Sequence, residues 1–76
     1  MDLYTVDFMS FTDNGDTMIT LIEGDHIIHA FRFLKNIIGK DNVYFDGDTW
    51  ETDKTYERMI DGVLHTGKYS VNWYPN

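Results

Sequence analysis

Residues 4–22 read YTVDFMSFTDNGDTMITLI and decide how the chain begins to fold. Apolar and polar residues alternate on both sides of Asn14-Gly15, and this period of two is typical of a β-strand. Asn-Gly is the strongest short hairpin signal, because a type I′ turn needs a positive φ at both central residues. The stretch therefore predicts a hairpin with Asn14-Gly15 as its loop, which sets Phe8 opposite Leu21 and Phe11 opposite Met18.

Both faces of the predicted hairpin carry apolar side chains, so both need cover. We expect the second face either to be covered by a second helix or to form a dimer or partner interface. The first face reads Tyr4, Val6, Phe8, Ile19 and Leu21, and the second face reads Leu3, Met9, Phe11, Met18 and Ile22.

An amphipathic helix is predicted directly after the hairpin. Gly24-Asp25 supplies a chain break and an N-cap whose carboxylate favours the positive end of the helix dipole. Gly39 is the expected C-cap. Between these ends, apolar residues recur at i, i+3, i+4, i+7 and i+11, which is one face at about 100° per residue. They are Ile27, Ala30, Phe31, Leu34 and Ile38.

Short strands are predicted in the rest of the chain. Residues 42–45 predict one, and residues 49–51 return as another after a turn at Asp46-Gly47, although a bulge or a plain loop fits equally well. Residues 68–74 predict the last strand, with Tyr69, Val71 and Trp73 pointing inward.

Residues 53–65 fit two different structures. Apolar residues at 56, 59, 60, 63 and 64 have the spacing of a second amphipathic helix. Asp61-Gly62 is instead a hairpin signal, but the strand alternative sets Arg58 on an inward face between Tyr56 and Ile60. We therefore predict the helix. The resulting order, β-β-α-β-α-β, predicts one α+β domain over residues 1–76, a small and mostly antiparallel sheet packed with two helices.

Composition excludes several classes of function. The chain has 76 residues, 13 acidic against 6 basic, a formal charge of −7 and no cysteine. The lack of cysteine removes a disulfide scaffold, a thiol nucleophile and cysteine-based metal sites. The negative charge argues against direct binding to nucleic acid or to an anionic membrane, because both require neutralisation of phosphates. No stretch approaches the ~18 apolar residues of a membrane span, so we expect a cytoplasmic protein, in the host cytoplasm if the source is a phage.

No catalytic, cofactor or metal site is predicted. His26 and His29 form half of a zinc or nickel site and lack an evident third ligand, although His65 is available. The serines, Ser10 and Ser70, both lie inside predicted strands, which is a poor place for a hydrolase nucleophile. The carboxylates around residues 46–53 depart from the calcium-binding EF-hand loop, and no phosphate-binding glycine loop exists. We therefore expect a protein that is not an enzyme.

The acidic residues are unevenly placed. Residues 1–23 contain five acids and no base, residues 24–40 one acid and three bases, and residues 41–61 seven acids and two bases. The last block predicts a surface that binds a basic protein or mimics nucleic-acid phosphates, and the alternative is a solvated acidic face. The predicted partner-binding residues are Asp46, Asp48, Glu51, Asp53, Glu57 and Asp61, with aromatic support from Tyr44 and Trp50.

Phe33 is a further candidate for partner binding. It lies about 120° from the centre of the apolar stripe of the first helix, beside His26 and His29. An exposed aromatic ringed by polar groups is a common interface anchor. The alternative is that Phe33 covers a corner of the sheet.

In size, acidity and lack of cysteine the chain is similar to small phage-encoded inhibitors of host enzymes, including anti-CRISPR proteins and DNA mimics. This resemblance implies an inhibitor that occludes a basic, nucleic-acid-handling host protein. Two other interpretations remain. One is a homodimeric structural or regulatory module that uses the second hairpin face, and the other is a metal-binding protein that uses His26 and His29.

Overall fold

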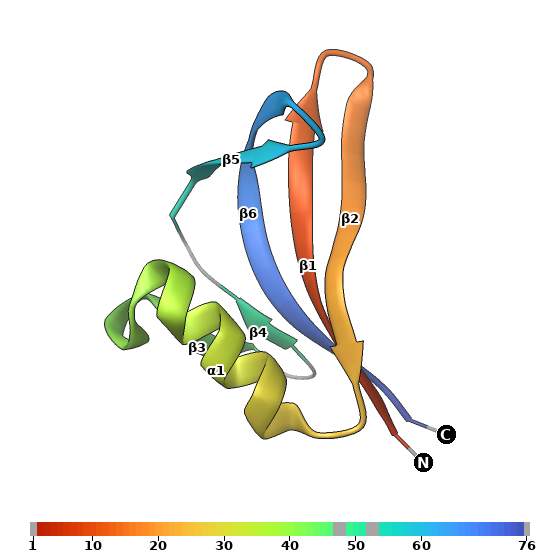
Figure 1. The fold of residues 1–76 in the computed structure, drawn as a ribbon, viewed down its shortest axis with the longest axis vertical. Coiled ribbons are helices and arrows are strands. Elements are labelled where there is room, and N and C mark those ends of the chain that lie inside the picture. The colour runs from red at the N-terminus through yellow and green to blue at the C-terminus, as the bar shows by residue number, and fades with distance from the viewer. Residues whose placement is uncertain (1, 47–48, 52–53, 76) are drawn as a thin grey trace.

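The predicted hairpin forms, but with a different turn. The computed structural model describes residues 2–46, 49–51 and 54–75, and its first strands are β1 (Leu3–Thr12) and β2 (Gly15–Gly24) (Figure 1). Thr12 pairs with Gly15 and Phe8 with Ile19, so the loop is Asp13-Asn14 and the predicted register was wrong by two residues. A type I′ turn at Asn14-Gly15 would require a positive φ at both residues. Gly15 has a φ of 112°, but the φ of Asn14 is not positive, so that turn does not form.

A β-bulge changes the second face of the hairpin. A slip of two residues keeps side chains on their predicted faces. Between Val6 and Asp7, however, the register shifts, so Val6 pairs with Ile22 and Asp7 with Thr20, leaving Leu21 as the extra residue. Ile22 therefore shares the face of Val6 and packs against the core, which corrects its predicted place on the second face.

The first helix forms as its pattern predicts. Helix α1 (Ile27–Ile38) buries Ala30, Leu34 and Ile38, and ends at Gly39, whose N–H donates to the Lys35 carbonyl at 2.8 Å. Its N-cap is His26 rather than the predicted Asp25, and His26 makes no side-chain capping bond. Packing of the apolar stripe, more than capping, thus stabilises this helix.

The predicted second helix is a hairpin. After the short 3-10 helix η1 (Lys40–Asn42), strands β3 (Tyr44–Asp46) and β4 (Thr49–Glu51) pair with each other, and β5 (Tyr56–Ile60) pairs with the start of β6 (Val63–Tyr74). Asp61 and Gly62 have φ of 51° and 80°, as the two central residues of a type I′ turn require. The turn signal decides this segment, and the helical spacing of its apolar residues is coincidental.

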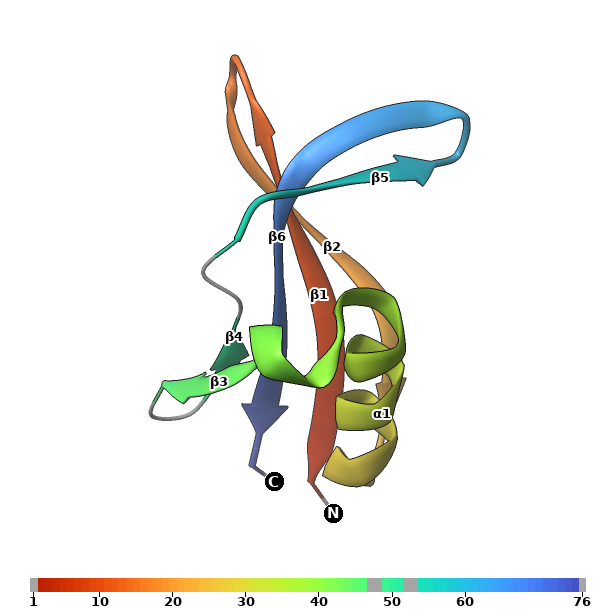
Figure 2. The ribbon, with the colours of Figure 1, turned by 90° about the vertical axis from the view of Figure 1, so that its left-hand side faces the viewer.

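All strands join one antiparallel sheet in the order β2-β1-β6-β4-β3, and β5 also pairs with β6. Gly67 pairs with Ser10 of β1 and with Tyr56 of β5, so β5 lies on the edge of β6 opposite to β1. Strand β4 follows along that same edge, at residues 70–72. Figure 2 shows α1 on one side of the sheet and the β5–β6 hairpin bent toward that side.

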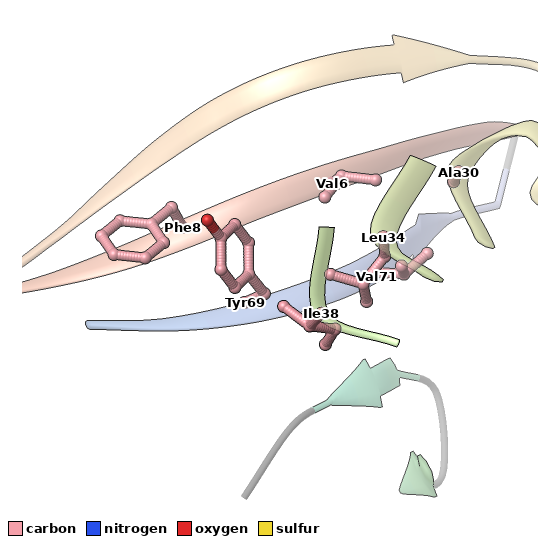
Figure 3. Close-up of a cluster of buried hydrophobic side chains, with 7 residues drawn as sticks. All are labelled: Val6, Phe8, Ala30, Leu34, Ile38, Tyr69 and Val71. Carbon is pink, nitrogen blue, oxygen red and sulfur yellow. The ribbon is translucent and has the colours of Figure 1, made fainter. Parts of the chain in front are cut away.

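The core lies between α1 and the sheet (Figure 3). Phe8 and Leu34 have no exposed surface, and the rings of Phe8 and Tyr69 meet edge to face with centroids 4.9 Å apart. We call the face that packs on α1 the helix face and the opposite one the back face. The buried core residues are Val6, Phe8, Ala30, Leu34, Ile38, Tyr69 and Val71.

Among the described residues, no helix is long and apolar enough to cross a membrane.

Candidate functional site

The back face combines exposed apolar and acidic side chains. Strand register assigns residues to it, because directly paired residues share a face and alternate residues along a strand return to it. Met9 pairs with Met18 and with Lys68, and Leu64 of β6 pairs with Met59. Its exposed apolar side chains are Leu3 (39% exposed), Phe11 (42%), Met18 (47%), Met59 (62%), Leu64 (57%) and Tyr74 (51%).

Carboxylates stand beside these apolar side chains. Asp16 pairs with Phe11 at one end of the back face, and Glu57 precedes Met59 by two residues on β5. Glu23, paired with Thr5, is the third exposed acidic residue of this face, and Lys68 is a basic residue on it. The back face therefore combines exposed apolar surface with more acidic than basic side chains among these residues.

The predicted partner-binding residues divide between two hairpins. Tyr44 and Asp46 lie on β3, and Trp50 and Glu51 lie on β4. Pairing of Glu51 with Ser70 and with Tyr44 assigns positions 44, 46 and 51 to the back face, whereas Trp50 pairs with Val71 of the helix face. Asp48 and Asp53 lie outside the described residues.

Glu57 and Asp61 lie on the β5–β6 hairpin and not on the predicted second helix. Glu57 is exposed on β5, and Asp61 is exposed in the turn that follows it. The two hairpins adjoin successive stretches of one edge of β6, so Glu51 and Glu57 lie on strands that pair along that edge.

Phe33 is half-buried and packs against the core. This agrees with the alternative interpretation, in which Phe33 covers part of the sheet. Its ring is therefore less available as an interface anchor than Phe11, which is the more exposed phenylalanine.

A buried carboxylate occupies the middle of the back face. Asp7 is 1% exposed and accepts hydrogen bonds from the hydroxyls of Thr5 and Thr20, each at 2.8 Å, and from the Asn72 side-chain amide. Asn72 also donates to the Ser70 hydroxyl at 3.1 Å. A buried polar group is tolerated when it is hydrogen-bonded in this way, so Asp7 joins β1, β2 and β6 rather than serving as a free reactive group.

A second polar cluster lies on the helix face, where the β5–β6 hairpin bends over. Ser10 Oγ and His65 Nδ1 share a hydrogen bond of 2.7 Å, and Arg58 Nη1 donates to the Tyr69 hydroxyl at 3.3 Å. Ser10 and Tyr69 are buried, with 1% and 3% exposure. The serine and histidine are the types a hydrolase pairs, but a buried hydroxyl is a poor nucleophile because substrate cannot reach it.

His26 and His29 lie one turn apart at the start of α1, with ring centroids 5.4 Å apart. His26 Nε2 is 3.6 Å from Asp25 Oδ1, and both side chains are exposed. Within the described part of the chain, no three histidine, aspartate or glutamate side chains are grouped as a metal ion requires.

Comparisons with known proteins assign no family to the chain. No protein-family model, curated protein or solved structure matches it significantly.

Sequence reasoning missed two of these features. The Ser10–His65 and Arg58–Tyr69 contacts join residues 55 and 11 positions apart in the sequence, and no local sequence pattern indicates them. The sequence analysis also did not predict that Met59 and Leu64 add exposed apolar surface to the back face, because it assigned both residues to a helix. The Asp61-Gly62 dipeptide was the signal that would have found it.

Proposed function

We propose that this protein is a small, acidic, non-enzymatic binding module that occludes a basic surface of a nucleic-acid-handling protein. One observation carries the proposal, namely that carboxylates accompany the exposed apolar side chains of the back face. Asp16 pairs with Phe11 and lies two residues from Met18. Glu57 lies two residues from Met59, which pairs with Leu64.

This combination suits a partner with an apolar centre and basic rim. Burying exposed apolar surface contributes about 25 cal/mol per Å² removed from water. The carboxylates speed encounter with a basic surface and disfavour nucleic acid and anionic lipid. Because such attraction is screened, affinity should fall as salt is raised.

The acidic block of residues 41–61 extends this face in the proposal. Register assigns Tyr44, Asp46 and Glu51 to the same face as Glu57. Asp48 and Asp53 are included from sequence alone. Trp50 pairs with Val71 in the helix-face register, so its aromatic support is proposed from sequence alone.

Affinity capture with charge-reversed variants tests the proposal. The test variant is Asp16→Lys/Glu57→Lys, and the matched control is Asp13→Lys/Asp25→Lys, which makes the same charge change at exposed loop sites outside the strands of the back face and outside the acidic block. A partner retained by the wild type and the control, released by salt and by added DNA, and lost from the test variant supports the proposal. Equal retention by both variants contradicts it.

A homodimer is the second candidate function. The observation that favours it is that Leu3, Phe11 and Met18, members of the predicted second hairpin face, remain exposed in the single chain. Sedimentation velocity over micromolar concentrations decides between the two. A monomer across that range removes the dimer, whereas a dimer that Met18→Lys dissociates supports it.

A further inference from the structure

We propose that the helix face of the bent β5–β6 hairpin binds a small oxyanion, a phosphate or a carboxylate, between Arg58 and His65. The proposal goes beyond the function proposed above, because this cluster lies on the other side of the sheet from the back face. Arg58 and His65 are both half-buried.

Strand pairing places the two side chains together. Arg58 is directly opposite His65 in the β5–β6 ladder, so both belong to the same face. Side chains at directly opposite positions have Cβ atoms about 4.5–5.5 Å apart. A guanidinium and an imidazole at that separation can both reach one oxyanion.

Each side chain is held by a buried partner from the core side of the sheet. The hydrogen bond with Ser10 fixes Nδ1 of His65 and leaves Nε2 as the other polar atom of the ring. The Tyr69 hydroxyl accepts from Nη1 of Arg58, and the guanidinium lies 6.0 Å from the centroid of the Tyr69 ring. Ser10 and Tyr69 are almost fully buried, so the two groups are oriented before any ligand arrives.

The chemistry of the pair selects an anion. A guanidinium has five N–H donors, and the bond to Tyr69 uses one of them. The remaining donors fit the paired oxygens of a carboxylate or phosphate. Arg58 supplies the positive charge that attracts the anion, and His65 adds the polar Nε2 atom beside it.

The test is an NMR titration of the full chain with inorganic phosphate, and separately with acetate, at fixed pH and constant ionic strength set by chloride. The variants are Arg58→Gln, Arg58→Lys and Lys68→Gln. Lys68 is exposed on the back face, so its substitution removes the same charge away from the proposed site. Each variant's amide spectrum reports whether the fold is retained.

We expect saturable shifts in the His65 ring and in the amides of residues 57–58 and 65–66. Arg58→Gln should weaken binding about tenfold or more, since a charge-assisted hydrogen bond is about 1.4 kcal/mol or stronger. Arg58→Lys should weaken it less, and Lys68→Gln should leave it unchanged. Shifts with phosphate alone or acetate alone assign the ligand class. No saturable shift with either anion, or equal weakening by Lys68→Gln, overturns the proposal.

Discussion

Gly67 of β6 crosses Met9 of β1 so closely that a Cβ on residue 67 would overlap the Met9 carbonyl group. The same Cβ would also lie 3.1 Å from the Phe8 ring. Gly67 is the residue where β6 passes from its pairing with β5 to its pairing with β1. The close crossing therefore lets the β5–β6 hairpin bend over the helix face.

Gly67→Ala should destabilise the protein by about 1–3 kcal/mol, the usual cost of forcing extra volume into a packed site. Denaturant unfolding measures it. Gly24→Ala is the matched control, because a Cβ there meets nothing within 4 Å, and it should change stability by about 0.5 kcal/mol or less. Similar effects at both glycines would show that the crossing does not constrain the sheet.

Gly62→Ala distinguishes the hairpin from a helix at residues 53–65. In the type I′ turn, residue 62 has φ 80°, which alanine adopts with strain, so stability should fall by more than about 0.5–1 kcal/mol. In a helix the same change would raise stability by about 1 kcal/mol, because alanine is the better helix former. Thermal unfolding reports the sign, and a stabilised variant would contradict the hairpin.

Asp7→Ala should destabilise the protein by about 1–3 kcal/mol, because it leaves the Thr5, Thr20 and Asn72 donors without their shared acceptor. Asp7→Asn keeps the size and one acceptor oxygen, so its effect should be smaller. Chemical denaturation of both variants, compared with Asp16→Asn at an exposed site, measures this order. An Asp7→Ala variant as stable as the Asp16→Asn control would refute the structural role of the network.

Leu34→Ala should cost about 2–5 kcal/mol, since it opens a cavity at a side chain with no exposed surface. Ile28 lies on the same helix and is 52% exposed, so Ile28→Ala should change stability by about 0.5 kcal/mol or less. Equal losses in urea unfolding would mean that α1 packs through another face.

The local patterns predicted the hairpin, the first helix and its buried residues Ala30, Leu34 and Ile38, because each depends on neighbouring residues. Ile27 of the predicted stripe is instead 39% exposed. The turn at Asp13-Asn14 differs by one residue because Gly15, and not Asn14, takes the positive φ. Apolar positions 56, 59, 60, 63 and 64 fit a helix and a strand pair equally well. The strand alternative was rejected because it sets Arg58 on an inward face. In the structure Arg58 donates a hydrogen bond there to the Tyr69 hydroxyl, and the sequence gives no sign of this partner.

The candidate site was less predictable than the fold. Charge counts identified acidic segments, but strand pairing decides which carboxylates share a face with exposed apolar groups. Asp16 enters the back face through its pairing with Phe11, although residues 1–23 were not part of the predicted site. Phe33, also a predicted site residue, lies on α1 and packs half-buried against the core.

Methionine methyl NMR of the complex tests the back-face proposal most directly. Met9, Met18 and Met59 belong to that face, and Ile28 and Ile37 are exposed on α1, so their methyl groups report on a different surface. When a captured partner is added to methyl-labelled protein, we predict shifted or broadened signals from the three methionines and unchanged signals from the two isoleucines. Perturbed isoleucine methyls with unchanged methionines would contradict the account.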